Sequence, residues 1–469
     1  AGEKSLLVLS AALRLTCEGL VVTAVALNAN GRNLLPWLAG KLTGAAHLSQ
    51  SKDALRIVYP PAPQGSEDER LFAPSPSDVL RVCAAAPLVK ETSPALTPLV
   101  AGVFSYDFLG AYEKLPPWRA DPLRWPDYEF WLPDQMIWVH HHQERVTAVT
   151  LAYGGERFAE VYHDAGIALA KLSEACQARL GESGREQTLA GGAVHTDIDD
   201  AAFAEMVRTV KRHIIAGDVY QIVPSRTFSL PCTDALAAYG RLRELNPSPY
   251  MFFVRGAAGT LFGASPETAV KVNGKRRVEI RPIAGTRPRA RVGAGPIDAD
   301  ADNRLEAELR LDGKELAEHM MLVDLARNDV ARVSVSGTRA VERLLGVDRY
   351  AHVMHLVTHV TGELRPDLDA LHAYVATMNM GTLVGAPKLK AAALLRQYEV
   401  SKRGPYGGAV GYFSHDGQMD TCIVIRSAVV QDGMAHVRAG AGVVLDSDPE
   451  AETRETRSKA ESVLQAVRG

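Results

Sequence analysis

Two pairs of glutamates are the residues in this 469-residue sequence with the clearest chemical potential. Glu315 and Glu318 stand three apart within 312–332, where apolar residues recur at helical spacing, and Glu452 and Glu455 repeat the pattern near the C-terminus. Residues three apart on a helix share one face, so each pair presents two carboxylates together. Two solvated helix faces are the alternative. If the pairs converge, the four carboxylates need a cation between them, and oxygen ligation favours Mg2+.

Nearby histidines and cysteines do not indicate a transition metal. His319 follows the first pair, but Glu-Leu-Ala-Glu-His matches neither the Glu-x-x-His of di-iron bundles nor the paired histidines of zincins. The three histidines at 140–142 fall in an expected strand, where neighbouring side chains point to opposite faces. The five cysteines are scattered and form no Cys-x-x-Cys pair. A hard cation is therefore the better expectation.

Two glycine-rich turns could offer backbone amides to an anion. The stretch 381–388 precedes an expected helix start, where anions are favoured, but its spacing is not that of a Walker loop. Gly440 and Gly442 lack the third glycine of a dinucleotide fingerprint. Simple tight turns remain the alternative for both. Arg426 follows the apolar run 423–425 and is costly to bury unless an anion or a carboxylate pairs with it.

The elements around these residues indicate an α+β fold in which strands and helices alternate irregularly. Aperiodic sequence over 181–196 predicts a linker, with an N-terminal α/β region over 1–180 and a catalytic region over 197–469. Expected hairpins pair 5–13 with 20–25, 136–142 with 145–149, and 409–413 with 422–430. Expected helices cover 200–216, 312–332, 389–398 and the segment after Pro449, and the first of these places Phe203, Met206, Val207, Val210, Ile214 and Ile215 on one face.

Composition places the chain among ordinary globular proteins. It is 46% hydrophobic and 23% charged, with a net charge of −3, which gives no basic excess for nucleic acid. No apolar run approaches the ~18 residues that span a bilayer. Unpaired cysteines fit a reducing cytoplasm. Because the sequence starts at Ala1 rather than Met, we expect a processed or truncated N-terminus.

Ordered sequence blocks across almost the whole chain resemble the chorismate-utilising enzymes, and within them the branch that forms anthranilate. The clearest blocks are Gln221-Ile-Val-Pro-Ser-Arg226, Phe262-Gly-Ala-Ser-Pro-Glu267, Pro282-Ile-Ala-Gly-Thr-Arg287, Leu322-Val-Asp-Leu-Ala-Arg-Asn-Asp329 and Asp420-Thr-Cys-Ile-Val-Ile-Arg426. The resemblance implies a large α+β chorismate-binding fold with two packed β-sheets flanked by helices. It also implies a lyase that adds ammonia at C2 of chorismate and then eliminates pyruvate.

The resemblance assigns roles to individual residues. Glu318 and Glu455 would hold Mg2+, with Glu315 and Glu452 as water-mediated or outer ligands. Glu267 would be the acid that protonates the leaving hydroxyl, and His355 would assist removal of the C2 proton, although a histidine on a buried strand is ordinarily structural. The residues implied to bind the substrate carboxylates are Tyr406, Arg426, Gly440, Gly442 and Lys459, and those implied to line the ring are Gly285, Thr286 and Thr382.

The sequence differs at two positions from other branches of the family that it resembles. Isochorismate and salicylate synthases place a water-activating lysine where this sequence has Gln221, and a neutral amide cannot act as a base near pH 7. Aminodeoxychorismate synthases place a nucleophilic lysine where it has Ala284. Both differences favour ammonia as the nucleophile. An enzyme that stops at aminodeoxyisochorismate stays open, as does a non-catalytic regulatory protein on the same fold.

The resemblance also implies partners and a regulator. No segment offers the nucleophilic cysteine of a glutamine amidotransferase, so a separate subunit would supply ammonia from glutamine. Hydrolysis of glutamine by this chain alone would contradict that expectation. A heterotetramer of two such pairs is implied. Tryptophan would bind an inhibitor site, and since the chain begins after the place of a Leu-Leu-Glu-Ser segment, we expect weak inhibition. The residues that match this site are Lys4, Pro249, Tyr250, Met251, Val410 and Tyr412.

Overall fold

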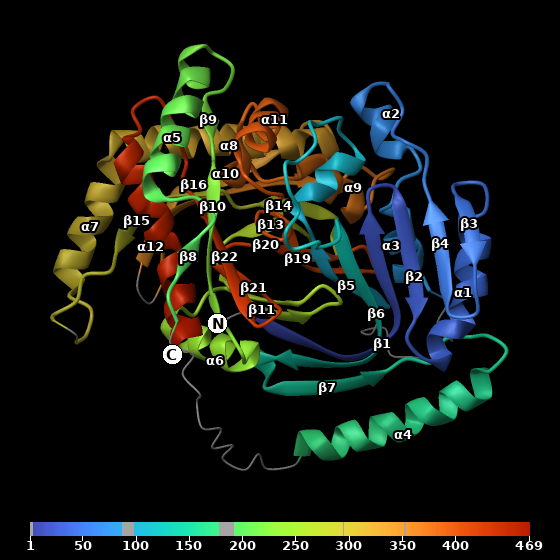
Figure 1. Cartoon of the computed structure of the whole chain (residues 1–469). Coiled ribbons are helices and arrows are strands. Elements are labelled where there is room, and N and C mark those ends of the chain that lie inside the picture. The colour runs from blue at the N-terminus through green and yellow to red at the C-terminus, as the bar shows by residue number, and fades with distance from the viewer. Residues whose placement is uncertain (1–2, 87–97, 178–191, 294, 351–352) are drawn as a thin grey trace. The chain divides into compact units, whose positions relative to one another are not determined.

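The computed structural model describes residues 3–86, 98–177, 192–293, 295–350 and 353–469 (Figure 1). Its helices and strands alternate irregularly, which confirms the predicted α+β class. The chain packs into two compact units, the first made of 1–114, 125–188 and 410–419, and the second of 115–124, 189–409 and 420–469. The predicted division into 1–180 and 197–469 did not include two short exchanges, because 115–124 belongs to the second unit and 410–419 belongs to the first. The predicted linker, 181–196, lies mostly outside the described residues, and its end forms strand β8 (His195–Thr196).

The first unit is built on a sheet with strand order β19-β5-β6-β1-β2-β4-β3, in which β7 also pairs with β6. Its strands are β1 (Lys4–Glu18), β2 (Val21–Ala26), β3 (His47–Gln50), β4 (Ala54–Val58), β5 (Leu99–Phe104), β6 (Tyr128–His140), β7 (Arg145–Thr150) and β19 (Ala409–Ser414). Its helices are α1 (Ala29–Leu42), α2 (Glu67–Phe72), α3 (Asp78–Ala84) and α4 (Phe158–Gln177), with 3-10 turns at Tyr106–Ala111 and His141–Gln143. The two predicted N-terminal hairpins are confirmed as the antiparallel pairs β1–β2 and β6–β7.

The second unit contains a six-stranded sheet, β11-β12-β21-β22-β10-β8, and a further set of paired strands, β15-β17-β14-β13-β20 with β16 on β17. Its remaining strands are β9 (Gln221–Ile222), β10 (Ser225–Pro231), β11 (Tyr250–Arg255), β12 (Thr260–Ser265), β13 (Thr268–Val272), β14 (Arg277–Ile280), β15 (Ile283–Pro288), β16 (Ala340–Arg349), β17 (Val353–Glu363), β18 (Gly385–Ala386), β20 (Met419–Ile423), β21 (Ser427–Gln431) and β22 (Met434–Gly440). Its helices are α5 (Asp200–Ile215), α6 (Ala235–Leu245), α7 (Ala299–Leu311), α8 (Gly313–Val333), α9 (Ala370–Thr377), α10 (Gly381–Val384), α11 (Lys388–Tyr398) and α12 (Pro449–Arg468).

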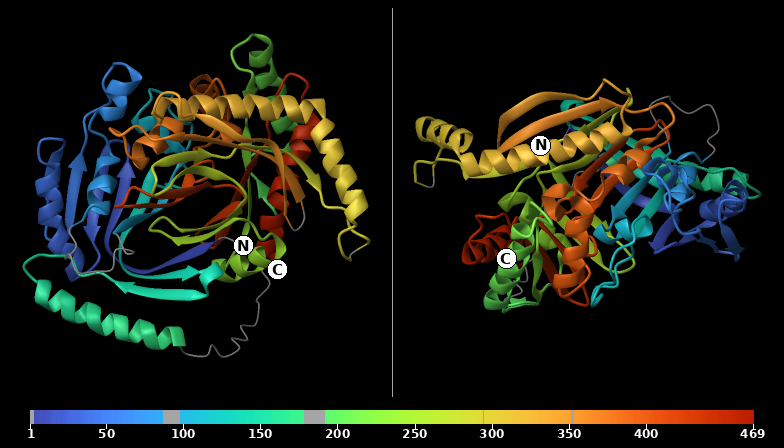
Figure 2. Two further views of the ribbon diagram at one scale, coloured as in Figure 1. Left: turned by 180° about the vertical axis from the view of Figure 1, so that it is seen from behind. Right: turned by 90° about the horizontal axis from the view of Figure 1, so that it is seen from above.

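Two helices of the second unit pack so that they can present side chains to one place. Helix α12 buries Val463 and Val467 against Leu242 of α6 and strands of the six-stranded sheet, including Phe228 and Val437. Helix α8 lies across β15 and β17 (Figure 2). Both helices begin where the sequence predicts, since aspartates cap them and Pro449 occupies the first turn of α12.

The structure corrects two predicted elements. Strand β20 ends at Ile423 and β21 starts at Ser427 in a different sheet, so 422–430 is not one hairpin arm. The break lies at Arg426, whose φ of 49° is unusual for a residue with a side chain. Helix α5 buries its predicted apolar residues through Val210, but Ile215 is 71% exposed because the packed face ends before the last turn. No helix in the described ranges is long and apolar enough to cross a membrane.

Candidate functional site

The four predicted carboxylates come together in the second unit. Glu318 on α8 is electrostatically coupled to Glu315 on the same helix and to Glu455 on α12, and Glu455 is coupled in turn to Glu452. Burial, reinforced by these neighbouring charges, raises the pKa of Glu318 and of Glu452. Burial is the largest single influence on Glu455, but Lys459, Arg426 and Lys314 together outweigh it and keep the pKa of that carboxyl below its ordinary value. The two glutamate pairs, whose convergence the sequence patterns left open, thus lie close enough to influence one another.

The carboxylates differ in their partners. Glu315 accepts a hydrogen bond from Arg287 at 3.2 Å, and Glu318 accepts one from the Gln221 amide nitrogen at 3.1 Å. Lys459 lies 2.5 Å from Glu455. The Glu452 side chain is buried, and its Oε2 has no hydrogen-bond partner in the described part of the chain. An unpartnered buried carboxylate oxygen beside other carboxylates is a setting that a bound cation would relieve.

These carboxylates fit Mg2+ better than a metal enclosed by protein ligands. Across the ranges that the structure describes, no three His, Cys, Asp or Glu side chains surround a common point. A closed structural zinc site needs such a set, whereas Mg2+ usually keeps several waters and takes only one or two carboxylates plus a substrate oxygen. Glu318 and Glu455 are suited to that open arrangement.

A cationic group without a counter-ion lies next to the carboxylates. The half-buried Arg426 side chain forms no ion pair or hydrogen bond with any residue that the structure describes, although Glu455 and Glu267 lie near enough to influence its pKa. Burial is the largest influence and lowers that pKa. Arg426 lies in the break between β20 and β21, outside both strands. A half-buried guanidinium without a carboxylate partner among the described residues is a strong candidate for binding a carboxylate ligand.

The glycines of the predicted anion site are required by close packing. A Cβ at Gly440 would lie 2.7 Å from the Pro224 carbonyl oxygen and 3.1 Å from the Tyr406 hydroxyl. Lys459 donates to the Gly440 carbonyl oxygen at 3.1 Å. A Cβ at Gly442 would lie 3.0 Å from the Gln221 amide nitrogen. The bare backbone of these residues therefore lies among the polar groups of the site.

Glu267 and His355 are buried with pKa values displaced in opposite directions. Burial raises the pKa of Glu267 to about 8, partly offset by Thr382 and by the backbone of Ile283. The Thr382 hydroxyl approaches this carboxyl without reaching good hydrogen-bond geometry, since its oxygen is buried and has no partner. Burial and the nearby Arg426 lower the pKa of His355 to about 4. Near pH 7 the site thus holds a protonated acid and a neutral imidazole.

Backbone pairing positions the imidazole. The ring Nδ1 of His355 on β17 lies 2.9 Å from the Thr286 hydroxyl on β15, and Thr286 pairs directly with His355 in the register of these strands. Gly285 interrupts that register with a φ of 82°, and a Cβ there would press on Glu315, Leu309 and Leu356. The bulge at Gly285 therefore brings the strand close to the carboxylates.

The stretch 381–388 does not form a phosphate-binding turn. Residues 381–384 form the short helix α10, and the Lys388 ammonium binds both carboxylate oxygens of Asp329, at 3.0 and 2.9 Å, and the Thr377 carbonyl oxygen at 2.9 Å. The lysine is thereby committed to holding the segment that carries Thr382. Within 381–388, Lys388 therefore has a structural role, whereas Thr382 contributes to the site.

Gln221 has a role that sequence reasoning missed. The sequence singles it out only as the absence of a lysine, whereas the structure shows its amide nitrogen bonded to Glu318. Its strand β9 pairs with β18, so that Ala386 faces Gln221, and Ile222 pairs with Val443 on the other side. Only its position inside an ordered block could have drawn attention to it, because its partners are far away in sequence.

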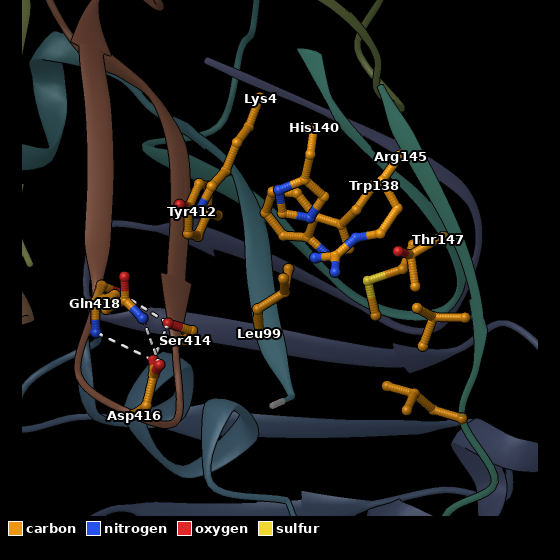
Figure 3. Close-up of a pocket in the computed structure, with 13 residues that line it drawn as sticks. Lys4, Leu99, Trp138, His140, Arg145, Thr147, Tyr412, Ser414, Asp416 and Gln418 are labelled. Atoms are coloured by element: carbon orange, nitrogen blue, oxygen red, sulfur yellow. Dashed lines mark hydrogen bonds between the residues drawn. The ribbon is translucent and has the colours of Figure 1, made fainter. Parts of the chain in front are cut away.

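The residues predicted for inhibitor binding lie in both units. Lys4 and Tyr412 line a pocket of about 260 Å³ in the first unit, together with Trp138, His140 and Arg145 (Figure 3). Val410 lies on β19 in the same unit and does not line the pocket. The remaining three, Pro249, Tyr250 and Met251, belong to the second unit, where the Tyr250 hydroxyl donates to Asp420 at 2.9 Å. The inhibitor site stays a prediction.

Comparison with known proteins identifies the family. A family model described as "chorismate binding enzyme" matches residues 52–465. The chain is 48% identical to "Anthranilate synthase component 1" of Vibrio cholerae, over 99% of this chain and 88% of that one. It is also 48% identical to "Anthranilate synthase component 1, pyocyanine specific" of Pseudomonas aeruginosa, over 100% and 87%. The crystal structure of anthranilate synthase component I from Streptococcus pneumoniae matches with a TM-score of 0.79 at 28% identity, covering 98% of this chain and 92% of that one. The chain belongs to the family of chorismate binding enzymes.

Proposed function

We propose that this chain converts chorismate and ammonia to anthranilate and pyruvate. The proposal rests on one observation. A buried acid, Glu267, is protonated near pH 7 and a buried base, His355, is neutral, and both are influenced by the charge of Arg426. Glu267 has a pKa of about 8, His355 has a pKa of about 4, and Arg426 influences both. A two-stage reaction that first protonates a leaving group and then removes a carbon-bound proton needs such a pair.

The substrate's two carboxylates match the cationic and metal-binding ends of the site. Arg426 would bind one carboxylate through two guanidinium N–H groups, and the Tyr406 hydroxyl and Lys459 would bind the same carboxylate. The amides of Gly440 and Gly442 would complete that end. Glu318 and Glu455 would hold Mg2+ directly, with Glu315 and Glu452 acting through water. When bound, the metal supplies polarisation of the ring carboxylate and offsets the mutual repulsion of the glutamates.

In the first stage ammonia would add to C2 through its lone pair, the two ring double bonds would shift from C1=C2 and C5=C6 to C1=C6 and C4=C5, and the bond from C4 to its hydroxyl group would break. Glu267, protonated near pH 7, would give its proton to the departing oxygen, which leaves as water. The new ammonium substituent then loses one proton, so that the stage consumes ammonia and releases water with no change in net charge. The Thr382 hydroxyl beside Glu267 is free to bond the leaving oxygen.

In the second stage neutral His355 would assist removal of the proton at C2. The electron pair left at C2 forms the last ring double bond while the bond between C3 and the enolpyruvyl oxygen breaks. The departing group takes up a proton and leaves as pyruvate, and the ring becomes aromatic. Thr286 supports this role because its contact with Nδ1 fixes the orientation of the imidazole.

We further propose a separate glutaminase as the source of ammonia, in a heterotetramer of two subunit pairs. The designation "component 1" of the relatives implies a second component. The chain's own cysteines do not suggest a glutaminase, since Cys17, Cys83, Cys232 and Cys422 are buried. Among the described residues, which include all five cysteines, no disulfide forms, and this fits a reducing compartment such as the cytoplasm.

The test is to incubate the purified chain with chorismate, ammonium and Mg2+ and to follow the ultraviolet fluorescence of the aromatic product, with chromatography of the mixture. We expect anthranilate and pyruvate in equal amounts. Accumulation of aminodeoxyisochorismate would show that elimination is not completed, and isochorismate or aminodeoxychorismate as the main product would contradict the proposal. No turnover of chorismate under any of these conditions would favour a regulatory role.

A further inference from the structure

Arg403 is a buried cation behind the carboxylate-binding end of the site. Its side chain is 0% exposed, and its guanidinium carbon lies 5.7 Å from the centre of the Tyr406 ring. A cation within ~6 Å of an aromatic ring centre is attracted to the face of that ring. The hydroxyl of the same tyrosine lies beside the glycine turn, since a Cβ at Gly440 would be 3.1 Å from it. Tyr406 therefore lies next to both the buried cation and the turn.

Hydrogen bonds fix the guanidinium in this position. Its Nε and Nη2 groups donate to the two carboxylate oxygens of Glu399, at 2.9 and 2.6 Å. Nη2 also donates to the Val223 carbonyl oxygen at 2.6 Å, and Nη1 donates to the Leu383 carbonyl oxygen at 2.6 Å. Leu383 follows Thr382 on α10, so the guanidinium is bonded to an element that carries a site residue. The cation therefore cannot shift away from Tyr406 without breaking several bonds.

The carboxylate that orients Arg403 is itself held by other groups. Glu399 accepts from the backbone nitrogen and the hydroxyl of Ser225, both at 2.8 Å, and from Arg438 at 3.0 Å. Burial is the largest influence on Glu399, but Arg403 and Arg438 outweigh it and keep the pKa of that carboxyl below its ordinary value. Because desolvation offsets most of the attraction in a buried ion pair, stability alone does not explain a second arginine at this carboxylate.

The charge of Arg403 acts on the Tyr406 hydroxyl. Burial raises the pKa of Tyr406, and Arg403 is the strongest of the groups that oppose this rise, ahead of Lys459. Glu399 acts in the opposite direction and more weakly. A cation near a phenol stabilises negative charge on its oxygen, so the O–H group becomes a stronger hydrogen-bond donor while it stays protonated.

We propose that Arg403 is a positioning residue for chorismate that acts through Tyr406. The inference rests on the proposed function, in which the Tyr406 hydroxyl donates to a substrate carboxylate beside Arg426 and Lys459. The fixed guanidinium strengthens that hydrogen bond from behind the ring and does not touch the substrate. Arg403 therefore contributes to the binding of chorismate and not to either chemical stage.

Two variants of Arg403 separate its charge from its hydrogen bonds. The dissociation constant of chorismate is measured by titration calorimetry with Mg2+ and without ammonium, after circular dichroism has shown an intact fold. Arg403→Gln removes the charge and leaves Glu399 paired with Arg438, and we expect it to raise the constant about tenfold. Arg403→Lys keeps a charge but cannot form all the bonds of the guanidinium, and should raise the constant less than about threefold. The exposed Arg304 on α7 gives a matched control, Arg304→Gln, which should change nothing.

A double-mutant cycle with Tyr406→Phe tests whether the hydroxyl transmits the effect. Phenylalanine keeps the ring but has no O–H group for the cation to strengthen. In the Tyr406→Phe background, Arg403→Gln should therefore raise the dissociation constant less than about twofold. The same tenfold loss in both backgrounds would mean that Arg403 supports the site as a whole, and would overturn the inference.

Turnover separates this inference from the proposed function. At saturating chorismate, Arg403→Gln should keep kcat within about threefold, with an unchanged KM for ammonia, and a larger loss of kcat would refute a role in binding alone. If the glutamine variant does not fold, Arg403→Lys decides, since a tenfold weaker affinity in that variant would contradict the role of the charge. An unmodified chain that binds chorismate but forms no anthranilate would refute the proposed function, while the dissociation constants would still decide the inference.

Discussion

Replacing Glu267 with glutamine should impair activity and stabilise the protein at neutral and alkaline pH. The side chain is 6% exposed, and burial is the largest cause of its raised pKa. Glutamine has nearly the same shape but cannot ionise and cannot give a proton to the leaving hydroxyl. Loss of a general acid ordinarily costs a factor of about 10² to 10⁴ in kcat.

The effect on stability follows from the displaced pKa. A change from 4.5 to about 8 corresponds to about 5 kcal/mol in the free energy of ionising this carboxyl. Because the folded protein binds the proton more tightly than the unfolded chain, this group makes the free energy of unfolding fall as pH rises from 4.5 to about 8. The penalty is about 3 kcal/mol at pH 7 and reaches its full value above pH 8. Glu267→Gln removes it, so the variant should equal the unmodified protein below pH 4.5 and exceed it at pH 9.

The assay is denaturant unfolding of both proteins without substrate at several pH values between 4.5 and 9, beside Glu174→Gln as a control for an exposed glutamate on α4. Activity is measured in parallel and expressed per free-base ammonia. We expect the stability difference for Glu267→Gln to grow with pH, and the control to show none. A difference that is independent of pH would refute a raised pKa at Glu267, and full activity of the variant would refute its role as the acid.

Three further predictions concern the rest of the site. Glu318→Ala and Glu455→Ala should each abolish Mg2+-dependent turnover while circular dichroism shows an intact fold, and full activity of either variant in excess EDTA would contradict the metal assignment. Arg426→Met should raise the KM for chorismate about tenfold or more with the KM for ammonia little changed, as measured by separate titration of the two substrates. The isolated chain should form product from ammonium and not from glutamine, and release of glutamate by the purified chain would disprove the need for a glutaminase partner.

Local signals explain how far the sequence could predict this structure. Asp312 caps α8 by accepting from the backbone of Lys314 and Glu315, and Pro449 starts α12 after the capping Asp448. Such contacts join residues within one turn, and their signature is readable in a few letters. The glutamate pairs on these helices were predictable for the same reason. That the pairs meet was predictable only from family resemblance.

Contacts between distant residues set the limit of prediction. Gln221 and Glu318 are 97 residues apart and meet because short strands on both sides of Gln221 fix its backbone. Arg426 lies in an apolar run that reads as continuous strand, yet its positive φ divides that run between two sheets. Neither feature has a local sequence signal, since both depend on which strands become neighbours. Local sequence therefore could not predict these contacts, although the family resemblance had already implied a carboxylate-binding role for Arg426.

Buried polar groups in the scaffold around the site differ from those in the site itself in how completely they are hydrogen-bonded. Close to the site, the buried Glu399 is fully paired, with Arg403 at 2.6 Å, Arg438 at 3.0 Å and Ser225 at 2.8 Å. Within the site, three buried atoms have no hydrogen-bond partner among the residues that the structure describes, namely Gln221 Oε1, Thr382 Oγ1 and Glu452 Oε2. Each costs about 1–3 kcal/mol in the free protein, and the surrounding saturated network prevents relaxation that would remove the cost. Under the proposed function, the same rigidity leaves these groups ready to bond substrate and metal, so the stability lost in the free protein is recovered when those ligands bind.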